Sequence, residues 1–145
     1  MSSKPIYTTA TEAEAAFYDA LARADLEAMM AVWSEDDEVM CVHPGGLRLM
    51  GLPAIRESWR QLFHGKPKLK IRISQHAEVS NMMMTVHTLV EHVVLADVET
   101  PAPPPVAATN VYTRGAYGWR IVVHHASPTP EAQDPLAEGL PRTVH

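Results

Sequence analysis

In two stretches before Gly65, from Ala13 to Trp33 and from Ile55 to Phe63, the apolar side chains recur every three or four residues, which is the spacing of amphipathic helices. Thr11 and Glu14 fit a capping box at the start of the first helix. Asp25 can cap a second, shorter helix, and Pro53 suits the first turn of a third, where its missing N–H is not needed. The pattern therefore predicts three helices, the last of which ends near Gly65.

From residue 69 onward the hydrophobic period changes to two, as in strands with one solvated face. Two shorter segments before this point also have strand character and flank a Pro-Gly-Gly turn. The predicted strands cover residues 39–43, 47–50, 69–73, 82–95, 107–113 and 119–126. Helices that come first, followed by long antiparallel strands, predict an α+β fold in which the helices cover one face of a curved sheet.

The length of 145 residues favours a single domain. Prolines concentrate in a run at 101–105 and in the segment after residue 127, and both should be loops or extended because proline lacks an amide proton. We therefore divide the chain into an N-terminal arm (1–10), a folded domain (11–128) and a Pro-rich C-terminal tail (129–145). The tail is expected to lie extended over its own domain or over a dimer partner.

Charge and composition narrow the range of functions. The net charge of −5 gives no basic footprint for nucleic acid. The sequence contains no run of about 20 apolar residues that could span a membrane, and residues 1–10 lack the apolar stretch of a secretory signal. The single Cys41 excludes a disulfide within the chain and a multi-cysteine zinc site. We expect a cytoplasmic protein that binds neither nucleic acid nor membranes and needs no cofactor.

Several strings of residues carry a family resemblance. They are Asp-Leu-Glu-Ala at 25–28, Trp33 behind it, His-Pro-Gly-Gly at 43–46, Gly-Trp-Arg at 118–120 and His-His-Ala-Ser at 124–127. Over residues 11–128 the chain resembles the SnoaL-like branch of the NTF2-like superfamily. The resemblance implies a cone, with N-terminal helices packed in the concave face of a strongly bent mixed or antiparallel sheet. It also implies a cavity for a small molecule and a homodimer formed through the outer sheet face.

The ketosteroid isomerases of this superfamily allow a comparison position by position. Their aspartate general base precedes a proline at the end of the first strand, and the matching position here is His43. A tyrosine that binds the enolate oxygen corresponds to Phe17, which cannot donate a hydrogen bond, and a protonated aspartate corresponds to Asn110, whose amide can donate. The resemblance therefore implies His43 as a general base and Asn110 as a carbonyl anchor, but not the isomerases' own mechanism.

The last strand adds a third polar candidate. With a period of two, Trp119, Ile121, Val123 and His125 share one face, which we expect to point at the helices, while His124 points outward. His43, Asn110 and His125 would then meet at an apolar pocket. Its predicted lining is Phe17, Trp33, Trp59, Met84 and Val123.

Each of these residues also has a structural interpretation. His43 could bond the backbone of its own turn, Asn110 could bond neighbouring strand backbone, and His124 could belong to a dimer surface. His87 and His92 are five positions apart on one strand and should point to opposite faces.

A metal site is the remaining chemical option. His43 and His125 with Glu91 or Cys41 would make a mixed donor set of the kind that zinc or iron accepts. The only histidines at close spacing are adjacent and alternate across the sheet, so we expect no metal.

Together these observations predict a small-molecule pocket protein. If it is an enzyme, it is a cofactor-free isomerase, cyclase, dehydratase or hydrolase that transfers a proton on a small apolar carbonyl compound. The alternative is a non-catalytic module of the same fold that binds a ligand or dimerises.

Overall fold

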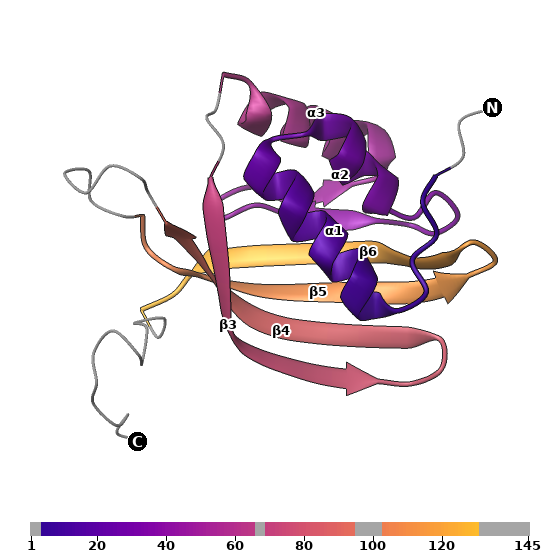
Figure 1. Cartoon of the computed structure of the whole chain (residues 1–145). Coiled ribbons are helices and arrows are strands. Elements are labelled where there is room, and N and C mark those ends of the chain that lie inside the picture. The colour runs from indigo at the N-terminus through magenta and orange to yellow at the C-terminus, as the bar shows by residue number, and fades with distance from the viewer. Residues whose placement is uncertain (1–3, 66–68, 95–102, 131–145) are drawn as a thin grey trace.

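The computed structural model describes residues 4–65, 69–94 and 103–130. The fold is α+β, as predicted, with three helices and a six-stranded sheet (Figure 1). The helices are α1 (Ala10–Arg23), α2 (Leu26–Val32) and α3 (Leu52–Phe63). The strands are β1 (Met40–Val42), β2 (Leu49–Met50), β3 (Lys70–Ser80), β4 (Met84–Val94), β5 (Val106–Gly115) and β6 (Gly118–Pro128). None of the helices in the described segments is long and apolar enough to cross a membrane.

The helix starts follow local capping chemistry. Asp25 caps α2 as expected, accepting a hydrogen bond from the Ala28 amide at 3.0 Å. Pro53 lies in the first turn of α3, also as expected. The cap of α1 differs from the prediction, because the capping box is formed by Thr9 and Glu12. Two Thr-x-x-Glu patterns overlap here, and only the earlier one forms the cap.

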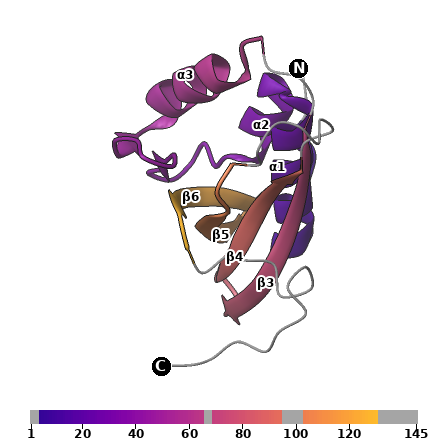
Figure 2. The ribbon, with the colours of Figure 1, turned by 90° about the vertical axis from the view of Figure 1, so that its left-hand side faces the viewer.

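The strand order is β2-β1-β6-β5-β4-β3. β1 runs parallel to β6 and every other neighbouring pair is antiparallel, so the sheet is mixed. The helices gather on one side of the bent sheet, with α1 crossing it obliquely (Figure 1) and α3 standing above the β6 end (Figure 2). We call the face toward α1 the inner face and the opposite one the outer face.

Two bulges control which side chains reach the inner face. In β3 an extra residue lies between Ser74 and Ala77, and Gln75 there has a positive φ of 53°. In β6 the extra residue lies beside Val111 and Tyr112 of β5. Because one inserted residue shifts the alternation by one position, each bulge exchanges the inner and outer sets along the rest of its strand.

The N-terminal segment is fixed to the β5–β6 turn. The Trp119 amide donates to the Tyr7 carbonyl at 2.8 Å, beside a bridge between Tyr7 and Gly118. Gly118 has a φ of +94°, and a Cβ at this position would lie 2.6 Å from the Tyr7 carbonyl oxygen. Only glycine fits this approach without a shift of backbone. The predicted tail lies outside the described residues from position 131 on.

Candidate active site on the inner face

A continuous chain of hydrogen bonds crosses the inner face between α1 and the sheet. His124 Nδ1 of β6 lies 2.6 Å from Asn110 Oδ1 of β5. The Asn110 Nδ2 amide donates to the Tyr18 hydroxyl of α1 at 2.9 Å, and that hydroxyl donates to Glu91 Oε2 of β4 at 2.7 Å. All four side chains are buried. We refer to Glu91, Tyr18, Asn110 and His124 as the inner relay.

The two adjacent histidines of β6 are placed opposite to the prediction. His124 is 2% exposed on the inner face and contacts the Phe17 ring, whereas His125 is exposed on the outer face. The reason is the β6 bulge. Ile121 points inward as expected, but the extra residue shifts the alternation, so that His124 follows it inward. His125 therefore lies away from Asn110, on the side of the sheet without helices.

His43 points into the molecule rather than toward its own turn. Its Nε2 lies 2.9 Å from the Ser58 hydroxyl of α3, and its ring packs edge-on against Trp59 with centroids 4.5 Å apart. The His43 and His124 rings are 6.5 Å apart, so His43 lies beside the end of the inner relay. Burial lowers the pKa of His43, which favours the neutral imidazole.

Burial sets the protonation of the inner relay. Desolvation raises the pKa of Glu91 to about 7, opposed by the hydrogen bond from Tyr18. Desolvation lowers the pKa of His124 to about 3, so that this ring is neutral. The pKa of Tyr18 lies well above its usual 10, because burial and the Glu91 carboxylate both disfavour a phenolate. At neutral pH, Glu91 is thus the member of the relay that can change its protonation state.

The predicted pocket residues do not gather around one cavity. Phe17, Trp33 and Trp59 are buried in the core, with Phe17 and Trp59 packed edge to face at 5.7 Å. Met84 is 44% exposed at the start of β4, and Val123 is half-buried on the outer face. The buried indole N–H groups of Trp33 and Trp59 have no hydrogen-bond partner among the described residues.

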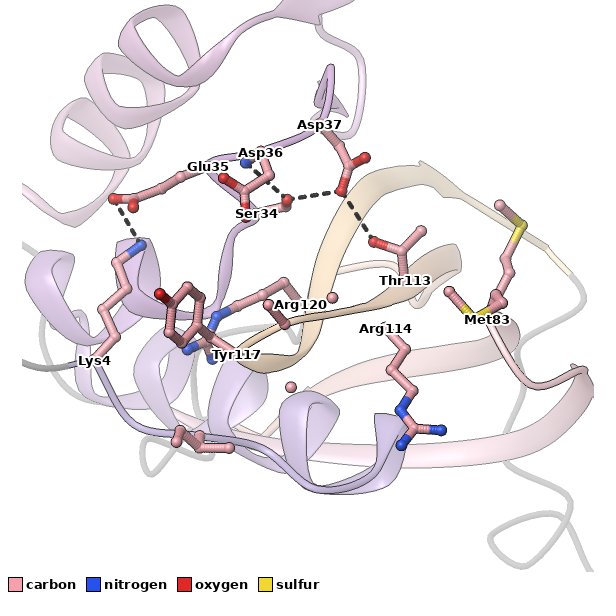
Figure 3. Close-up of a pocket in the computed structure, with 15 residues that line it drawn as sticks. Lys4, Ser34, Glu35, Asp36, Asp37, Met83, Thr113, Arg114, Tyr117 and Arg120 are labelled. Carbon is pink, nitrogen blue, oxygen red and sulfur yellow. Dashed lines mark hydrogen bonds and ion pairs between the residues drawn. The ribbon is translucent and has the colours of Figure 1, made fainter.

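A cavity of about 900 Å³ lies at the other end of the sheet, beside the β5–β6 turn (Figure 3). Of the predicted pocket residues, it is lined only by Met84. Its acidic rim is largely satisfied, because Glu35 pairs with Lys4 at 3.0 Å and Asp37 accepts from Ser34 and Thr113. The cavity therefore lies apart from the inner relay, none of whose four members lines it.

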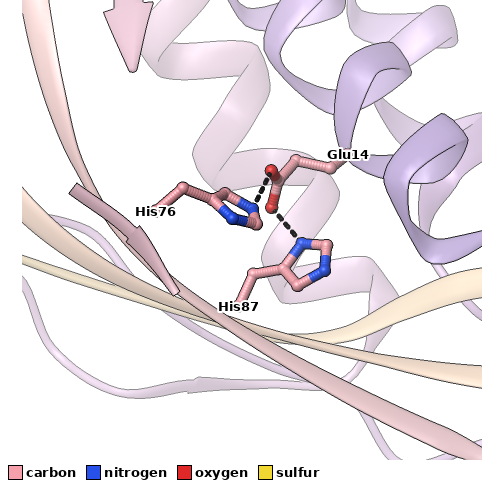
Figure 4. Close-up of side chains that lie close together, drawn as sticks. All are labelled: Glu14, His76 and His87. Carbon is pink, nitrogen blue, oxygen red and sulfur yellow. Dashed lines mark hydrogen bonds and ion pairs between the residues drawn. The ribbon is translucent and has the colours of Figure 1, made fainter. Parts of the chain in front are cut away.

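A second cluster of titratable groups lies next to the inner relay (Figure 4). Glu14 Oε1 is 3.0 Å from His76 Nε2, and Glu14 Oε2 is 2.7 Å from His87 Nδ1. His87 Nε2 is 2.9 Å from Glu78 Oε2, and the Tyr112 hydroxyl donates to Glu14 Oε2 at 3.1 Å. As predicted, His87 and His92 point to opposite faces, and His92 contacts Ser74 instead.

The mixed metal site considered from the sequence does not form in the described structure. His125 lies on the opposite face of the sheet from His43. Cys41 contacts His43 Nε2 at 3.6 Å, but burial raises the pKa of its thiol to about 12, which disfavours the thiolate that metals bind.

Sequence reasoning named Asn110 and His43, which the structure places in and beside the inner relay, and named Glu91 only as a possible metal ligand, whereas it did not name Tyr18 or the Glu14 cluster. One signal was available: Glu14 and Tyr18 are four apart on a helix and interrupt its apolar face. Two polar residues on the buried face of a helix indicate partners across the core.

Comparison with known proteins is consistent with this fold. A family profile for the SnoaL-like domain matches residues 11–131. The search of curated proteins gives no match. A structure from Thiobacillus denitrificans, named as a calcium/calmodulin-dependent protein kinase type II association domain, is 38% identical, with 86% of this chain and 98% of that chain covered and a TM-score of 0.79.

Two further structures have the same fold. One from Streptomyces avermitilis, named as a dehydratase of the NTF2-like family, is 27% identical, with 81% of this chain and 91% of that chain covered and a TM-score of 0.71. One from Parabacteroides distasonis, named as a ketosteroid isomerase, is 20% identical, with 92% of this chain and 98% of that chain covered and a TM-score of 0.68. The matched residues and the shared architecture show that this chain belongs to the SnoaL-like domain family, with the NTF2-like fold.

Proposed function

We propose that this protein is a proton-transfer enzyme acting on a small apolar carbonyl compound bound at the inner face. The inner relay is the observation that carries the proposal. Glu91 would exchange the proton, because its pKa of about 7 lets it both take up and release one at neutral pH. Tyr18 would orient that carboxyl through the hydrogen bond that its hydroxyl donates to it, and the Asn110 amide, which donates to Tyr18, would hold that hydroxyl in place.

The composition of the inner face supports a role beyond packing. A buried network of polar and ionisable side chains generally makes a fold less stable than apolar side chains of the same volume would. Here four buried polar side chains, each hydrogen-bonded, are surrounded by aromatic rings. His43, kept neutral by burial, lies at one end of the inner relay and could accept a hydrogen bond from a ligand. The neighbouring Trp59 N–H, which has no partner in the described part of the chain, could donate one.

Exchange of α-protons for deuterium tests the proposal without knowledge of the physiological substrate. Proton NMR in D₂O would follow exchange in 2-tetralone and cyclohexanone with wild type, Glu91→Gln and Tyr18→Phe. The matched control is Glu38→Gln, since Glu38 is exposed and far from the relay in sequence. We expect wild type to accelerate exchange and Glu91→Gln to lose about 10²-fold or more, the usual contribution of a general base. No acceleration by wild type, or equal rates for Glu91→Gln and Glu38→Gln, would refute the proposal.

A specific feature of the outer face favours a second function, self-association. Residues that are partners in register form an apolar row across all six strands, consisting of Val79, Val86, Val111, Val123, Met40 and Met50. None of the described helices covers this face (Figure 2). A continuous apolar row at the surface is typical of a protein–protein interface.

Sedimentation velocity tests this second function. We expect wild type to sediment as a dimer or a larger assembly. Val79→Glu should weaken the assembly at least tenfold, because Val79 is 76% exposed and a charge there would be buried in the interface. Leu47→Glu is the control, because Leu47 is 83% exposed and lies between β1 and β2, outside the row. A monomeric wild type, or an assembly indifferent to Val79→Glu, would exclude this role.

A further inference from the structure

Three side chains from three different elements converge beside the inner relay. Glu14 comes from α1, His76 from β3 and His87 from β4 (Figure 4). Each carboxylate oxygen of Glu14 faces one ring nitrogen, at 3.0 Å for His76 and 2.7 Å for His87. The potential ligand atoms of the three residues all lie within 4.8 Å of one another.

The β3 bulge brings His76 into this group. Before the bulge, Ile73 lies opposite the inward-facing Glu91 in the strand register. After the bulge, Glu78 lies opposite the inward-facing His87. The inserted residue thus turns the even-numbered positions 76 and 78 toward α1. Gln75 adopts a φ of 53°, which is unfavourable for a residue with a Cβ, and strain of this kind is concentrated at functional sites.

We propose that Glu14, His76 and His87 bind one divalent first-row transition ion, with Zn²⁺ as its representative. Two imidazoles and one carboxylate are a common donor set for such ions. Bonds of about 2.1 Å at tetrahedral angles place ligand atoms about 3.4 Å apart. The two spacings from Glu14 to the histidines, 3.0 and 2.7 Å, are shorter than this, and the three ligand atoms taken together lie within 4.8 Å of one another, so an ion requires side-chain rotations to bring them to equal distances.

The surroundings of the three ligands match those of a built metal site. Glu78 lies 2.9 Å from His87 Nε2, so it can accept that N–H while Nδ1 binds the ion. The Tyr112 hydroxyl donates to Glu14 and fixes the carboxylate. The side chains of His76 and Glu78 are 39% and 47% exposed, which gives an ion a path from solvent.

The three ligands also determine which metal ions the site binds. Mg²⁺ and Ca²⁺ prefer oxygen ligands, so two imidazoles should exclude both ions at concentrations at which Zn²⁺ binds. The proposal does not depend on the inner relay, because none of its three ligands belongs to that chain of hydrogen bonds. Metal binding and α-proton exchange can therefore fail or succeed separately.

Calorimetric titration of the untagged, EDTA-treated protein with ZnCl₂ tests the site, with MgCl₂ as the comparison. Co²⁺ would be titrated in parallel, because its visible absorption reports a protein ligand field. The key variant is His76→Ala, because this side chain is 39% exposed and lies outside the apolar core, and circular dichroism would verify the fold. His64→Ala, at an exposed histidine at the end of α3, is the matched control.

We expect one Zn²⁺ per chain, no heat from Mg²⁺, and visible Co²⁺ bands in wild type and His64→Ala. His76→Ala should weaken Zn²⁺ binding at least tenfold and abolish those bands. Glu78→Gln should weaken binding by about tenfold or more while keeping the stoichiometry, as expected for a partner of a ligating histidine. Absence of Zn²⁺ binding by wild type, or equal affinity in His76→Ala and His64→Ala, would overturn the proposal.

Discussion

Glu91→Gln should change how the stability of this protein depends on pH. Glutamine has the shape of the protonated carboxyl, and its side-chain oxygen can still accept the Tyr18 hydroxyl hydrogen bond. It differs in one respect, since it never ionises. The difference in unfolding free energy between the variant and wild type therefore isolates the ionisation of Glu91.

The magnitude follows from the displaced pKa. A glutamate has an ordinary pKa of 4.5, and burial raises that of Glu91 to about 7. Between these values the folded protein binds more protons than the unfolded chain, so wild type loses stability as the pH rises. Since each pH unit of separation corresponds to about 1.4 kcal/mol, the full loss is about 3 kcal/mol. Glu91→Gln should therefore gain about 3 kcal/mol relative to wild type between pH 4.5 and pH 8.

Urea unfolding at a series of pH values, followed by tryptophan fluorescence at one protein concentration, measures this difference. His124 and His43 also contribute to the pH dependence of stability. Both histidines are present in wild type and in Glu91→Gln, so their contributions largely cancel in the difference. Glu38→Gln, at an exposed glutamate, controls for the loss of a surface charge. A difference between Glu91→Gln and wild type that stays constant within about 0.5 kcal/mol from pH 4.5 to pH 8 would refute the reasoning.

Three other substitutions test separate parts of the structure. The pKa of His124 is lowered to about 3, so wild type should lose about 1.4 kcal/mol per pH unit below pH 6.5 relative to His124→Gln, as urea titrations at pH 4.5–6.5 would show. Gly118→Ala should destabilise by about 2 kcal/mol or more, measured by thermal unfolding, because its Cβ would meet the Tyr7 carbonyl. Ala24 ends α1 at a φ of 53°, so Ala24→Gly should stabilise by about 0.5–1 kcal/mol in the same measurement, and an equal or lower Tm would contradict this.

The secondary structure could be predicted because it depends on local chemistry. The change of hydrophobic period near residue 69 marks the passage from helices to strands, and Asp25 and Pro53 mark two helix starts. The first cap was misplaced because Thr9 and Thr11 both begin a Thr-x-x-Glu pattern. Which of the two patterns forms the cap depends on how the helix packs against the sheet, and the local sequence pattern holds no information on that packing.

The candidate site was only partly predictable, for a geometric reason. A period of two places His125 inward, but the inserted residue in β6 places His124 there instead. The β3 bulge likewise brings His76 to face Glu14. A bulge adds no distinctive residue type to the sequence, so its position follows from packing of the whole sheet. Contacts between Glu14, Tyr18 and residues more than 60 positions away depend on that same packing.

The central claim is that the inner face holds one carboxyl that titrates near neutrality and one histidine that stays neutral. A ¹³C NMR titration of protein labelled in glutamate and histidine side chains measures both groups directly, with Glu91→Gln and His124→Gln to assign the signals. The account predicts a Glu91 midpoint near pH 7 and a His124 ring that remains neutral down to about pH 3. A Glu91 midpoint near 4.5 together with a His124 midpoint near 6.5 would contradict it.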